Sequence, residues 1–282
     1  MSGSDARHVE RPDLALYAAR LGFQGSYTPT LETLRALHRL HPQAIPFENL
    51  TPLGGEAPAL ELPALESKLL RGRRGGWCFE HNLLLRAVLQ ECGFRVTALA
   101  ARVLWGQAPQ AETARSHMLL LVDVGGEPQV VDVGFGGLTL TAPLRLVADV
   151  VQDTPHGAFV LRRQGDCYRL HALLPQGETA LYRFDLTPQL PVDYAFANWY
   201  LATHPASVFV NTLRIARSVE AGRHALLNGD YHWRPLRGDV QQRQVESVAA
   251  LRVLLDDAFG IDLPASATTD ARLAPLLHNV RR

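Results

Sequence analysis

The feature that most constrains the fold is an uninterrupted apolar run that follows a pair of glycines and a cysteine. Residues 82–93 contain no proline and no interior glycine, and their apolar side chains fall on two helical stripes. Such a helix is apolar nearly all round, which is typical of a helix buried inside a domain. Gly93 is a natural residue to end it. The pattern therefore predicts a buried helix that is opened by the segment 75–78.

Cys78 lies in the first turn of this predicted helix. The free backbone N–H groups and the helix dipole favour negative charge there, and the reactive form of a cysteine is the thiolate. The opposite interpretation is an inert buried thiol, which is the commoner fate of a lone cysteine. The residues further along the chain decide between the two.

After this helix, the spacing of apolar residues changes to the alternation of a strand. Residues 95–104 predict one strand, and residues 117–124 and 129–133 predict an antiparallel pair that turns at two glycines. The turn is closed either by residues 124 and 127 or by residues 124 and 129. In both cases Asp132 falls on the same sheet face as His117, because the facing of side chains along a strand alternates with period two. Two polar residues inside apolar strands are costly unless they pair with each other.

Cys78, His117 and Asp132 are together the parts of an activated cysteine nucleophile. The imidazole takes the thiol proton, and the buried carboxylate fixes the imidazole tautomer and stabilises the imidazolium. The order of cysteine, histidine and carboxylate, with the cysteine opening a helix and the other two on strands, is the papain-like arrangement. His117 is one of 11 histidines, so its place in the hairpin selects it and its residue type does not.

The rest of the chain predicts helices toward both ends and strands between them. The expected helices are 13–21, 30–41 with Pro42 beyond its end, 63–70, 191–200 and 248–259. The further expected strands are 158–163, 167–173, 179–186, 224–227 and 231–234. Helices, then antiparallel strands suited to a barrel or a strongly curled sheet, then a mixed tail indicate an α+β protein.

The charge balance argues against two classes of partner. Lys plus Arg total 28 and Asp plus Glu total 28, so no net charge favours nucleic acid or a membrane surface. No apolar run approaches the ~20 residues that span a bilayer, and the polar start, residues 1–8, lacks the apolar core of a signal peptide. Three cysteines, an odd number, do not suggest a disulfide framework. We therefore expect a protein of the reducing cytoplasm.

Several motifs around these residues are similar to those of one enzyme family. The segment 74–82, RGGWCFEHN, resembles the active-site signature of the arylamine N-acetyltransferases. The segments 115–122, RSHMLLLV, and 131–136, VDVGFG, resemble the histidine and aspartate motifs of that family. Further likeness is found in the segments 29–34, 45–50 and 203–209. The resemblance runs from about residue 16 to residue 217 and is loose beyond residue 222.

The resemblance implies a papain-like fold in three parts. These are a helical bundle at residues 1–93 that carries the cysteine, an antiparallel β-barrel at 94–210 that carries the histidine and aspartate, and an α/β lid at 211–282. It also implies ping-pong transfer of an acetyl group from acetyl-CoA to the nitrogen of an arylamine or arylhydrazine, through an acetyl-cysteine. Such a reaction belongs to the metabolism of foreign compounds.

The resemblance further implies two sets of binding residues. The acceptor amine would lie against four apolar side chains: Phe47, Val103, Phe135 and Phe209. Acetyl-CoA would be contacted by Gly134 and Gly136, in a turn similar to the family's phosphate-contacting turn, and by Ser116 and Trp233. Without the resemblance, each of these would be interpreted as an ordinary core or turn residue.

The sequence leaves several alternatives. A related amide synthase would share the three catalytic residues but take its acyl chain from a carrier protein. A cysteine peptidase or transglutaminase-like hydrolase and a binding module with a structural thiol are the others. No metal site is expected, because clustered ligands at zinc spacing are lacking. The basic cluster of Arg71, Arg73 and Arg74 is expected to be a solvated surface patch. Neither the oligomeric state nor the physiological amine follows from the sequence.

Overall fold

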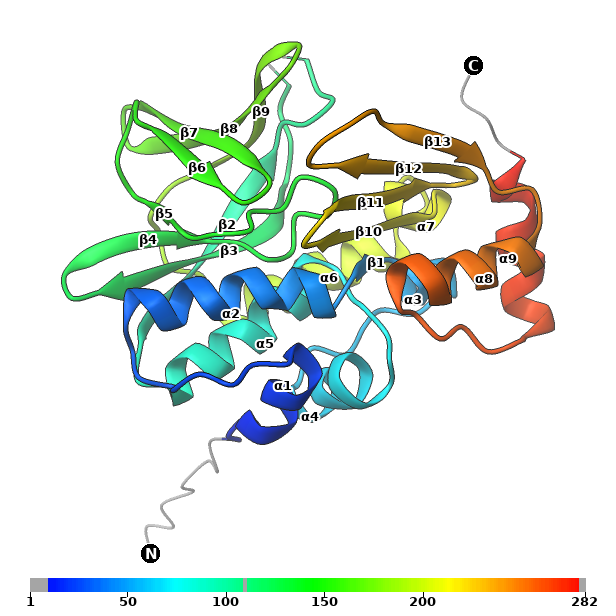
Figure 1. The fold of residues 1–282 in the computed structure, drawn as a ribbon, viewed down its shortest axis with the longest axis horizontal. Helices are drawn as coiled ribbons and strands as arrows, with labels where there is room; N and C mark the ends of the chain where they lie inside the picture. The colour runs from blue at the N-terminus through cyan, green and yellow to red at the C-terminus, as the bar shows by residue number, and fades with distance from the viewer. Residues whose placement is uncertain (1–9, 109–110, 279–282) are drawn as a thin grey trace, which may run out of the picture.

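The computed structural model describes residues 10–108 and 111–278 of the chain. The polar start, residues 1–8, lies outside the described residues, as do residues 109–110 between two of the expected strands. The helices are α1 (Leu14–Leu21), α2 (Leu31–Ala44), α3 (Leu50–Leu53), α4 (Leu62–Leu65), α5 (Cys78–Glu91), α6 (Pro191–Thr203), α7 (Val208–Asn211), α8 (Val248–Leu254) and α9 (Ala267–Leu277), with π-helical turns at Glu66–Arg71 and Leu255–Phe259. Together with the antiparallel sheets, they confirm the expected α+β class (Figure 1).

Eight strands in the middle of the chain form one curled antiparallel sheet. They are β2 (Arg95–Val103), β3 (Arg115–Val124), β4 (Glu127–Val131), β5 (Leu144–Arg145), β6 (Val151–Thr154), β7 (Gly157–Gln164), β8 (Cys167–Leu174) and β9 (Gly177–Phe184). Their order is β5-β4-β3-β2-β9-β8-β7-β6. An isolated bridge pairs Ala148 with Leu161 of β7, so the sheet is nearly closed into the expected barrel.

The hairpin between β3 and β4 has the shorter of the two expected turns. Val124 pairs with Glu127, and the two residues between them, Gly125 and Gly126, both have positive φ. Glycine adopts this conformation without steric cost, which is why a glycine pair suits a two-residue hairpin. The register that follows from this turn brings the end of β4 beside the start of β3.

A second antiparallel sheet lies mainly in the C-terminal part that the resemblance predicts to be the lid, and we refer to it as the lid sheet. Its strands are β1 (Phe47–Glu48), β10 (Arg214–Val219), β11 (Gly222–Leu227), β12 (Asp230–Pro235) and β13 (Gln241–Gln244), and they lie in this order. The expected hairpin at Asn228 is confirmed, and this residue has a φ of 54°. β1 comes from the N-terminal third of the chain and pairs Phe47 with Ala216. The lid sheet therefore contains a strand that the sequence pattern did not predict.

The helix that carries Cys78 is the buried helix expected from the sequence. Leu84, Leu85, Val88 and Leu89 have no exposed surface. These side chains share one apolar core with residues of α2 and of β3, and Figure 1 shows α2 and α5 running beneath the sheets. Most of the helix is buried or half-buried, with only Gln90 and Glu91 of its last turn exposed, which explains why the run is apolar nearly all round.

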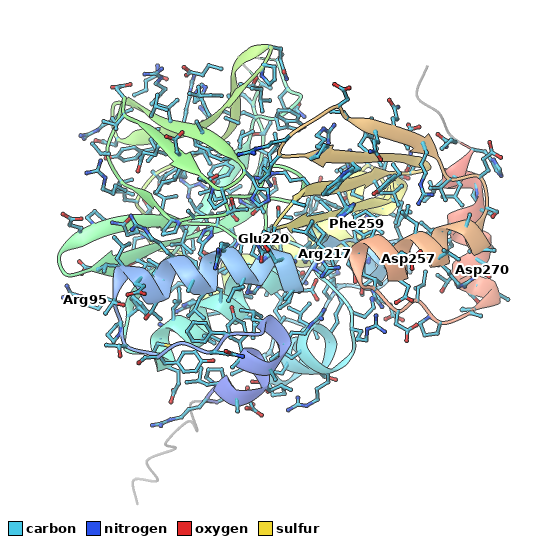
Figure 2. The ribbon with its side chains drawn as sticks, viewed as in Figure 1. Arg95, Arg217, Glu220, Asp257, Phe259 and Asp270 are labelled. Carbon is cyan, nitrogen blue, oxygen red and sulfur yellow. The ribbon has the colours of Figure 1, made fainter. Side chains whose placement is uncertain are left out.

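Polar contacts fasten the lid to the N-terminal helices. Arg217 of β10 donates through Nε to the carbonyl of Gln43 at 2.7 Å, and Figure 2 shows this residue between the end of α2 and α8, beside Phe259. Arg73 forms an ion pair of 2.8 Å with Asp256. The C-terminal part of the chain is therefore tied to the end of α2 and to the segment just before α5.

Two of the expected helices differ in detail from those in the structure. α2 continues through Pro42 to Ala44, because a proline in the last turn removes only one intrahelical hydrogen bond. The expected helix 63–70 is instead α4 followed by a π-helical turn. The strands β5, β6, β10 and β13 and the helices α3, α7 and α9 were not predicted.

Within the described ranges, no helix is long and apolar enough to cross a membrane.

Candidate active site

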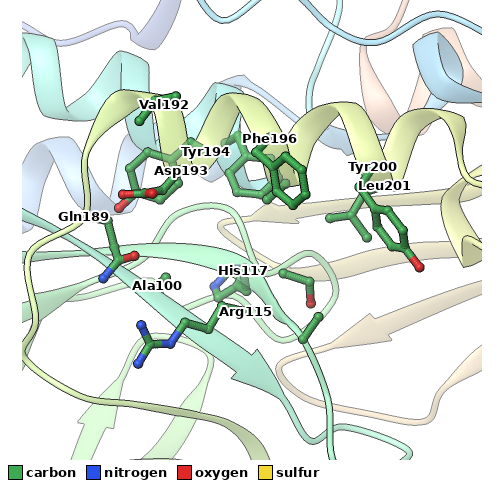
Figure 3. A pocket seen from close by; sticks show the side chains of 14 residues that line it. Ala100, Arg115, His117, Gln189, Val192, Asp193, Tyr194, Phe196, Tyr200 and Leu201 are labelled. Carbon is green, nitrogen blue, oxygen red and sulfur yellow. The ribbon is translucent and has the colours of Figure 1, made fainter.

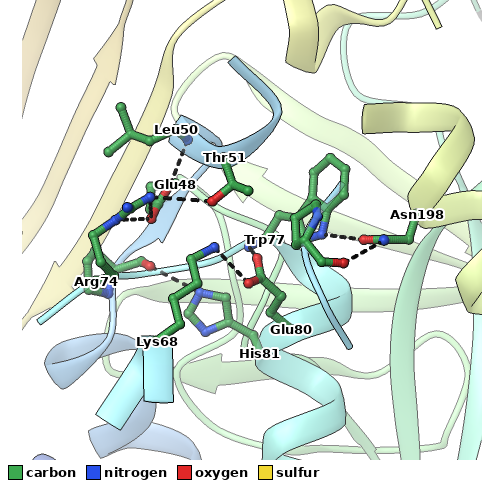
Figure 4. Close-up of polar contacts among 11 residues, drawn as sticks. Glu48, Leu50, Thr51, Lys68, Arg74, Trp77, Glu80, His81 and Asn198 are labelled. Carbon is green, nitrogen blue, oxygen red and sulfur yellow. Dashed lines mark hydrogen bonds and ion pairs between the residues drawn. The ribbon is translucent and has the colours of Figure 1, made fainter. Parts of the chain in front are cut away.

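Side-chain contacts around Trp77 fix the first turn of α5 and hence Cys78 (Figure 4). The Trp77 N–H donates to Glu80 Oε2 at 3.1 Å, and the Nζ of Lys68 lies 2.7 Å from Glu80 Oε1. Burial raises the pKa of the Glu80 carboxyl, while the charge of Lys68 acts in the opposite direction. A paired acidic group in the first turn also complements the helix dipole. The nucleophile helix thus begins at a fixed residue.

A second buried carboxylate anchors the arginine before the glycine pair. Arg74 Nη2 lies 2.7 Å from Glu48 Oε1, and Glu48 Oε2 accepts the N–H of Leu50 at 2.6 Å. Burial alone would raise the pKa of Glu48, but Lys68 and Arg74 lower it below its usual value. The expectation that the basic cluster is a solvated patch is therefore wrong for Arg74, whose ion pair joins two of the sequence motifs.

Close backbone approach explains the glycine pair itself. A Cβ at Gly75 would lie 2.0 Å from the carbonyl oxygen of Pro46, a distance that no side chain can occupy. Gly76 donates to the same carbonyl at 3.2 Å and accepts the N–H of Glu48 at 2.8 Å. The segments 45–50 and 74–78 therefore lie side by side, and only glycine fits where they meet.

The structure brings the predicted histidine and aspartate together. His117 Nε2 lies 2.7 Å from Asp132 Oδ2, and their side chains are 4% and 0% exposed. The other carboxylate oxygen, Oδ1, accepts from Asn82 Nδ2 at 3.1 Å and from the N–H of Gly134 at 2.9 Å. A buried carboxylate with three donors is held in one orientation.

The electrostatics of this pair favour a charged imidazole. Burial alone would lower the pKa of His117, but the charge and hydrogen bond of Asp132, together with the neighbouring Cys78, raise it to about 10. Burial alone would raise the pKa of Asp132, and His117 brings it below its usual value. The Sγ of Cys78 lies 3.9 Å from the Ser116 carbonyl. Because Asp132 holds Nε2, the Nδ1 of His117 is the nitrogen left for the thiol.

Two other buried side chains support the pair. The Nε2 of His38, on α2, accepts the backbone N–H of Asp132 at 3.2 Å. Burial lowers the pKa of His38 to about 4, so this ring stays neutral and can accept. The ring of Tyr182 lies 5.0 Å from that of His117. Both contacts restrict the positions that the triad residues can adopt.

The chain turns directly after Asp132 and passes against the nucleophile helix. A Cβ at Gly134 would lie 2.7 Å from the Cα of Cys78. The hydroxyl of Thr139 donates to the carbonyl of Asp132 at 3.0 Å and accepts the N–H of Phe135 at 3.3 Å. One short turn therefore positions the carboxylate and an aromatic ring against the cysteine.

The four residues predicted for the acceptor pocket are all half-buried and surround this centre. The rings of Phe47 and Phe209 lie 6.4 Å apart. The ring of Phe135 stands edge-on to His117 at 5.2 Å. Val103 pairs across the barrel sheet with Tyr182, whose ring also contacts His117. Their role in binding an acceptor stays a prediction.

The residues predicted to contact CoA fall in two places. Gly134 and Ser116 lie beside Cys78, and a Cβ at Gly136 would lie 3.5 Å from the ring of Phe47. Trp233 lies in the lid, where its ring stacks on His224 with centroids 4.2 Å apart. Within the part of the chain that the structure describes, no hydrogen bond or ring contact joins Trp233 to the turn at Gly134. Its role in CoA binding is also a prediction.

A cavity of about 410 Å³ lies between α6 and the start of β3, with His117 in one wall (Figure 3). Aromatic side chains of α6, including Phe196 and Tyr200, line it together with Phe79. None of the four predicted acceptor-pocket residues, all of which are described, lines this cavity. His117 is therefore reached by a cavity from the side of α6, where the four predicted acceptor-pocket residues do not lie.

Sequence reasoning missed three of the side chains that support the triad. Asn82 follows Cys78 by one helical turn within the signature, and this spacing places both on one helix face, a signal that could have found it. His38 and Tyr182 lie on other elements and carry no local signal. Among the described residues, no group of three His, Cys, Asp or Glu side chains is placed to hold a metal ion.

Comparison with known proteins agrees with this geometry. A family model described as N-acetyltransferase matches residues 30–268. The arylamine N-acetyltransferase of Escherichia coli is 41% identical over 251 residues, which cover 89% of each chain. That of Mycolicibacterium smegmatis is 41% identical over 271 residues, which cover 94% of this chain and 98% of the relative. The chain belongs to the arylamine N-acetyltransferase family.

Solved structures of this acyltransferase family share the fold. The structure of Mycobacterium marinum arylamine N-acetyltransferase matches with a TM-score of 0.90 at 39% identity and covers 94% of this chain and 100% of that one. A structure of the same enzyme in complex with CoA matches with a TM-score of 0.89, at 39% identity, over 94% of this chain and 99% of that one. The expected fold and enzyme class are confirmed, while the division at residues 93 and 210 stays a prediction.

Proposed function

We propose that the protein transfers the acetyl group of acetyl-CoA to the nitrogen of arylamines or arylhydrazines through an acetyl-cysteine at Cys78. The observation that carries the proposal is the pair of His117 and Asp132, 2.7 Å apart and buried beside the helix that opens at Cys78. Two relatives that are 41% identical to this chain are named arylamine N-acetyltransferase. The enzyme of Mycobacterium marinum was solved in complex with CoA.

The first half-reaction is the exchange of one thioester for another. The thiolate of Cys78 attacks the acetyl carbonyl, and the carbon–sulfur bond to CoA breaks as the new one forms. His117, protonated beside Asp132, gives its proton to the departing CoA sulfur. Backbone N–H groups at the start of α5 can stabilise the oxyanion of the tetrahedral intermediate. The products are acetyl-cysteine and free CoA.

The second half-reaction regenerates the thiol. The neutral amine attacks the acetyl carbon, His117 receives the proton of the amine nitrogen, and the Cys78 sulfur leaves. An aniline nitrogen is weakly basic and is mostly neutral at pH 7, so it needs positioning more than deprotonation. The half-buried rings of Phe47, Phe135 and Phe209 would supply that positioning. A neutral apolar pocket disfavours charged acceptors but discriminates poorly among apolar shapes.

A catalytic thiol also suits a reducing compartment. Cys78, Cys92 and Cys167 are all free, and disulfide-free proteins that work through a thiol are typical of the cytoplasm. A role in the metabolism of foreign amines would follow from the substrate class.

The proposal is tested by mass spectrometry of the purified protein after brief exposure to acetyl-CoA. We expect the mass to rise by one acetyl group, the modified peptide to contain Cys78, and the label to leave when an arylamine is added. Cys78→Ser should form no acetyl-enzyme, whereas Cys167→Ser, a free cysteine in the barrel, should behave as wild type. An unmodified wild-type protein, or a label on another residue, would contradict the assignment.

The same experiment addresses the alternative enzymes. An amide synthase would remain unmodified by acetyl-CoA but would take an acyl chain from a carrier protein. A hydrolase would cleave peptide or glutamine amides and would transfer nothing to an amine. A structural thiol would react slowly with iodoacetamide near pH 6, where a thiolate paired with His117 reacts fast.

A further inference from the structure

A buried positive charge lies where the lid meets the barrel. Arg223 of β11 is 6% exposed, and it forms no ion pair with any carboxylate in the ranges 10–108 and 111–278. Its guanidinium donates instead to the carbonyls of Gly137 at 3.2 Å and Thr139 at 2.9 Å and to the hydroxyl of Ser218 at 3.0 Å. A buried charge without a counter-ion is destabilising.

Arg223 remains charged at neutral pH. Burial and the charge of the cross-strand neighbour Arg234 lower the pKa of Arg223 to about 10. A guanidinium still protonated at pH 7, with only neutral oxygens as partners, contributes a positive potential around it. In a poorly hydrated environment this potential is weakly screened and extends to the next few residues.

The two carbonyls bound by Arg223 belong to the turn that follows the catalytic aspartate. Gly136 has a φ of +87°, and a Cβ at Gly137 would meet nothing within 4 Å. Neither Gly136 nor Gly137 donates its N–H to another described residue. Successive free N–H groups in a glycine turn are typical of anion sites. The turn therefore has N–H groups free for an anion, and two of its carbonyls are bound by a buried cation.

The same turn is connected to the triad. Thr139, whose carbonyl Arg223 binds, donates its hydroxyl to the carbonyl of Asp132 and accepts the N–H of Phe135. The guanidinium fork of Arg223 holds two points of the turn at once, which fixes its shape more firmly than a single contact. A residue of the lid thereby reaches the segment that carries the catalytic carboxylate.

We propose that Arg223 is a positioning residue for the acetyl donor: it sets the turn 134–139 from the lid side, and its unneutralised charge makes that turn selective for a donor that carries phosphate groups. This inference rests on the proposed function, since it names how the same site recognises acetyl-CoA. A donor that presents the same acetyl thioester without phosphates should gain nothing from the charge of Arg223.

The test compares two donors in the full-length protein. One is acetyl-CoA, and the other is the acetyl thioester of N-acetylcysteamine, which lacks phosphates. In a ping-pong reaction, kcat/KM for the donor reports only the first half-reaction, so the ratio of the two values measures phosphate recognition. Arg223→Gln keeps hydrogen-bond donors for the carbonyls but removes the charge, and Arg223→Lys keeps the charge.

We expect Arg223→Gln to lower kcat/KM for acetyl-CoA by about tenfold or more while the phosphate-free donor changes by less than about twofold. The ratio in Arg223→Lys should stay within about threefold of wild type. Arg163→Gln, an exposed arginine on β7, serves as the control and should leave the ratio unchanged. An equal loss with both donors would mean that Arg223 only supports the fold, and this outcome would overturn the proposal.

A second pair of variants tests the charge without altering Arg223. Ser218→Asp places a carboxylate beside the guanidinium and neutralises it, whereas Ser218→Asn adds a side chain of the same size without charge. We expect only Ser218→Asp to reduce the ratio of kcat/KM for acetyl-CoA to kcat/KM for the phosphate-free donor. Equal ratios in the two variants would contradict the proposal. If the wild-type protein accepts acetyl from neither donor, the proposed function fails. If it accepts from both and all variants keep the wild-type ratio, only the role of Arg223 fails.

Discussion

Gly134 offers the sharpest test of how the turn after Asp132 is packed against the nucleophile. A Cβ at this position would lie 2.7 Å from the Cα of Cys78 and 3.0 Å from Asn82 Nδ2, whereas ordinary contact begins at 3.4 Å. Backbone atoms of a buried helix cannot rotate away as the end of a flexible side chain can. Gly134→Ala must therefore move the turn and α5 apart by about 0.7 Å.

Two consequences of this displacement can be estimated. Overpacking of a buried contact costs about 1–3 kcal/mol in the free energy of unfolding. A misplacement of about 1 Å in reacting groups can cost on the order of 100-fold in rate, so a shift somewhat smaller than this should reduce kcat/KM roughly 10- to 100-fold. The loss should appear with both acetyl donors, because the distance between the cysteine and its imidazole is what changes.

The assay pairs urea unfolding with donor kinetics, and the control is Gly165→Ala. Gly165 lies in a barrel hairpin with a φ of +59° and nothing within 4 Å of its Cβ position. Its substitution should lower stability by about 1 kcal/mol through backbone strain alone and leave kcat/KM unchanged. If Gly134→Ala proves as active as Gly165→Ala, the close approach of the turn to Cys78 does not matter for catalysis and the reasoning is refuted.

Three other predictions follow from the buried polar groups. Burial lowers the pKa values of His38 and His81 to about 4, so below pH 6.5 the unfolded chain binds more protons than the folded protein. The free energy of unfolding, measured in urea, should therefore fall between pH 6.5 and pH 4, by up to about 3 kcal/mol for each histidine. The pKa of His117 is raised to about 10, so its effect on stability has the opposite sign: the contribution is complete below pH 6.5 and is lost as the pH rises through 10. We expect kcat/KM for the donor to decline only near that upper value. A decline near pH 7 would argue against a protonated imidazole. Asn82→Ala removes a donor from the Asp132 carboxylate and should cost about 1–3 kcal/mol of stability, which thermal or urea unfolding would detect; no change would mean that water replaces the amide.

Local signals in the sequence predicted the elements on which the candidate site is built. The apolar run after Cys78 determines α5, because a helix without a polar face must be buried. The glycine pair between β3 and β4 determines the hairpin, and period-two alternation then places Asp132 on the His117 face. These inferences use neighbours in the chain, where propensity and periodicity are informative.

The parts that were not predicted depend on contacts between distant residues. β1 is two residues long and exists because β10, more than 160 residues later, pairs with it. Arg74 was interpreted as solvated because nothing nearby in the sequence shows that Glu48 lies beside it in a buried position. Arg223 is an ordinary charged residue in an alternating strand, and only the fold reveals that no carboxylate among the described residues pairs with it.

The short strand β1 has a consequence for how the enzyme is made. Phe47, a wall of the predicted acceptor pocket, is synthesised early, but its sheet partner Ala216 emerges only after 168 further residues have been added. At about 5–20 residues per second, the ribosome needs roughly 10 to 30 s for this. During that interval the nascent chain holds a cysteine-bearing helix whose pocket is unfinished, and this wall of the pocket is complete only after about three-quarters of the 282 residues have been synthesised.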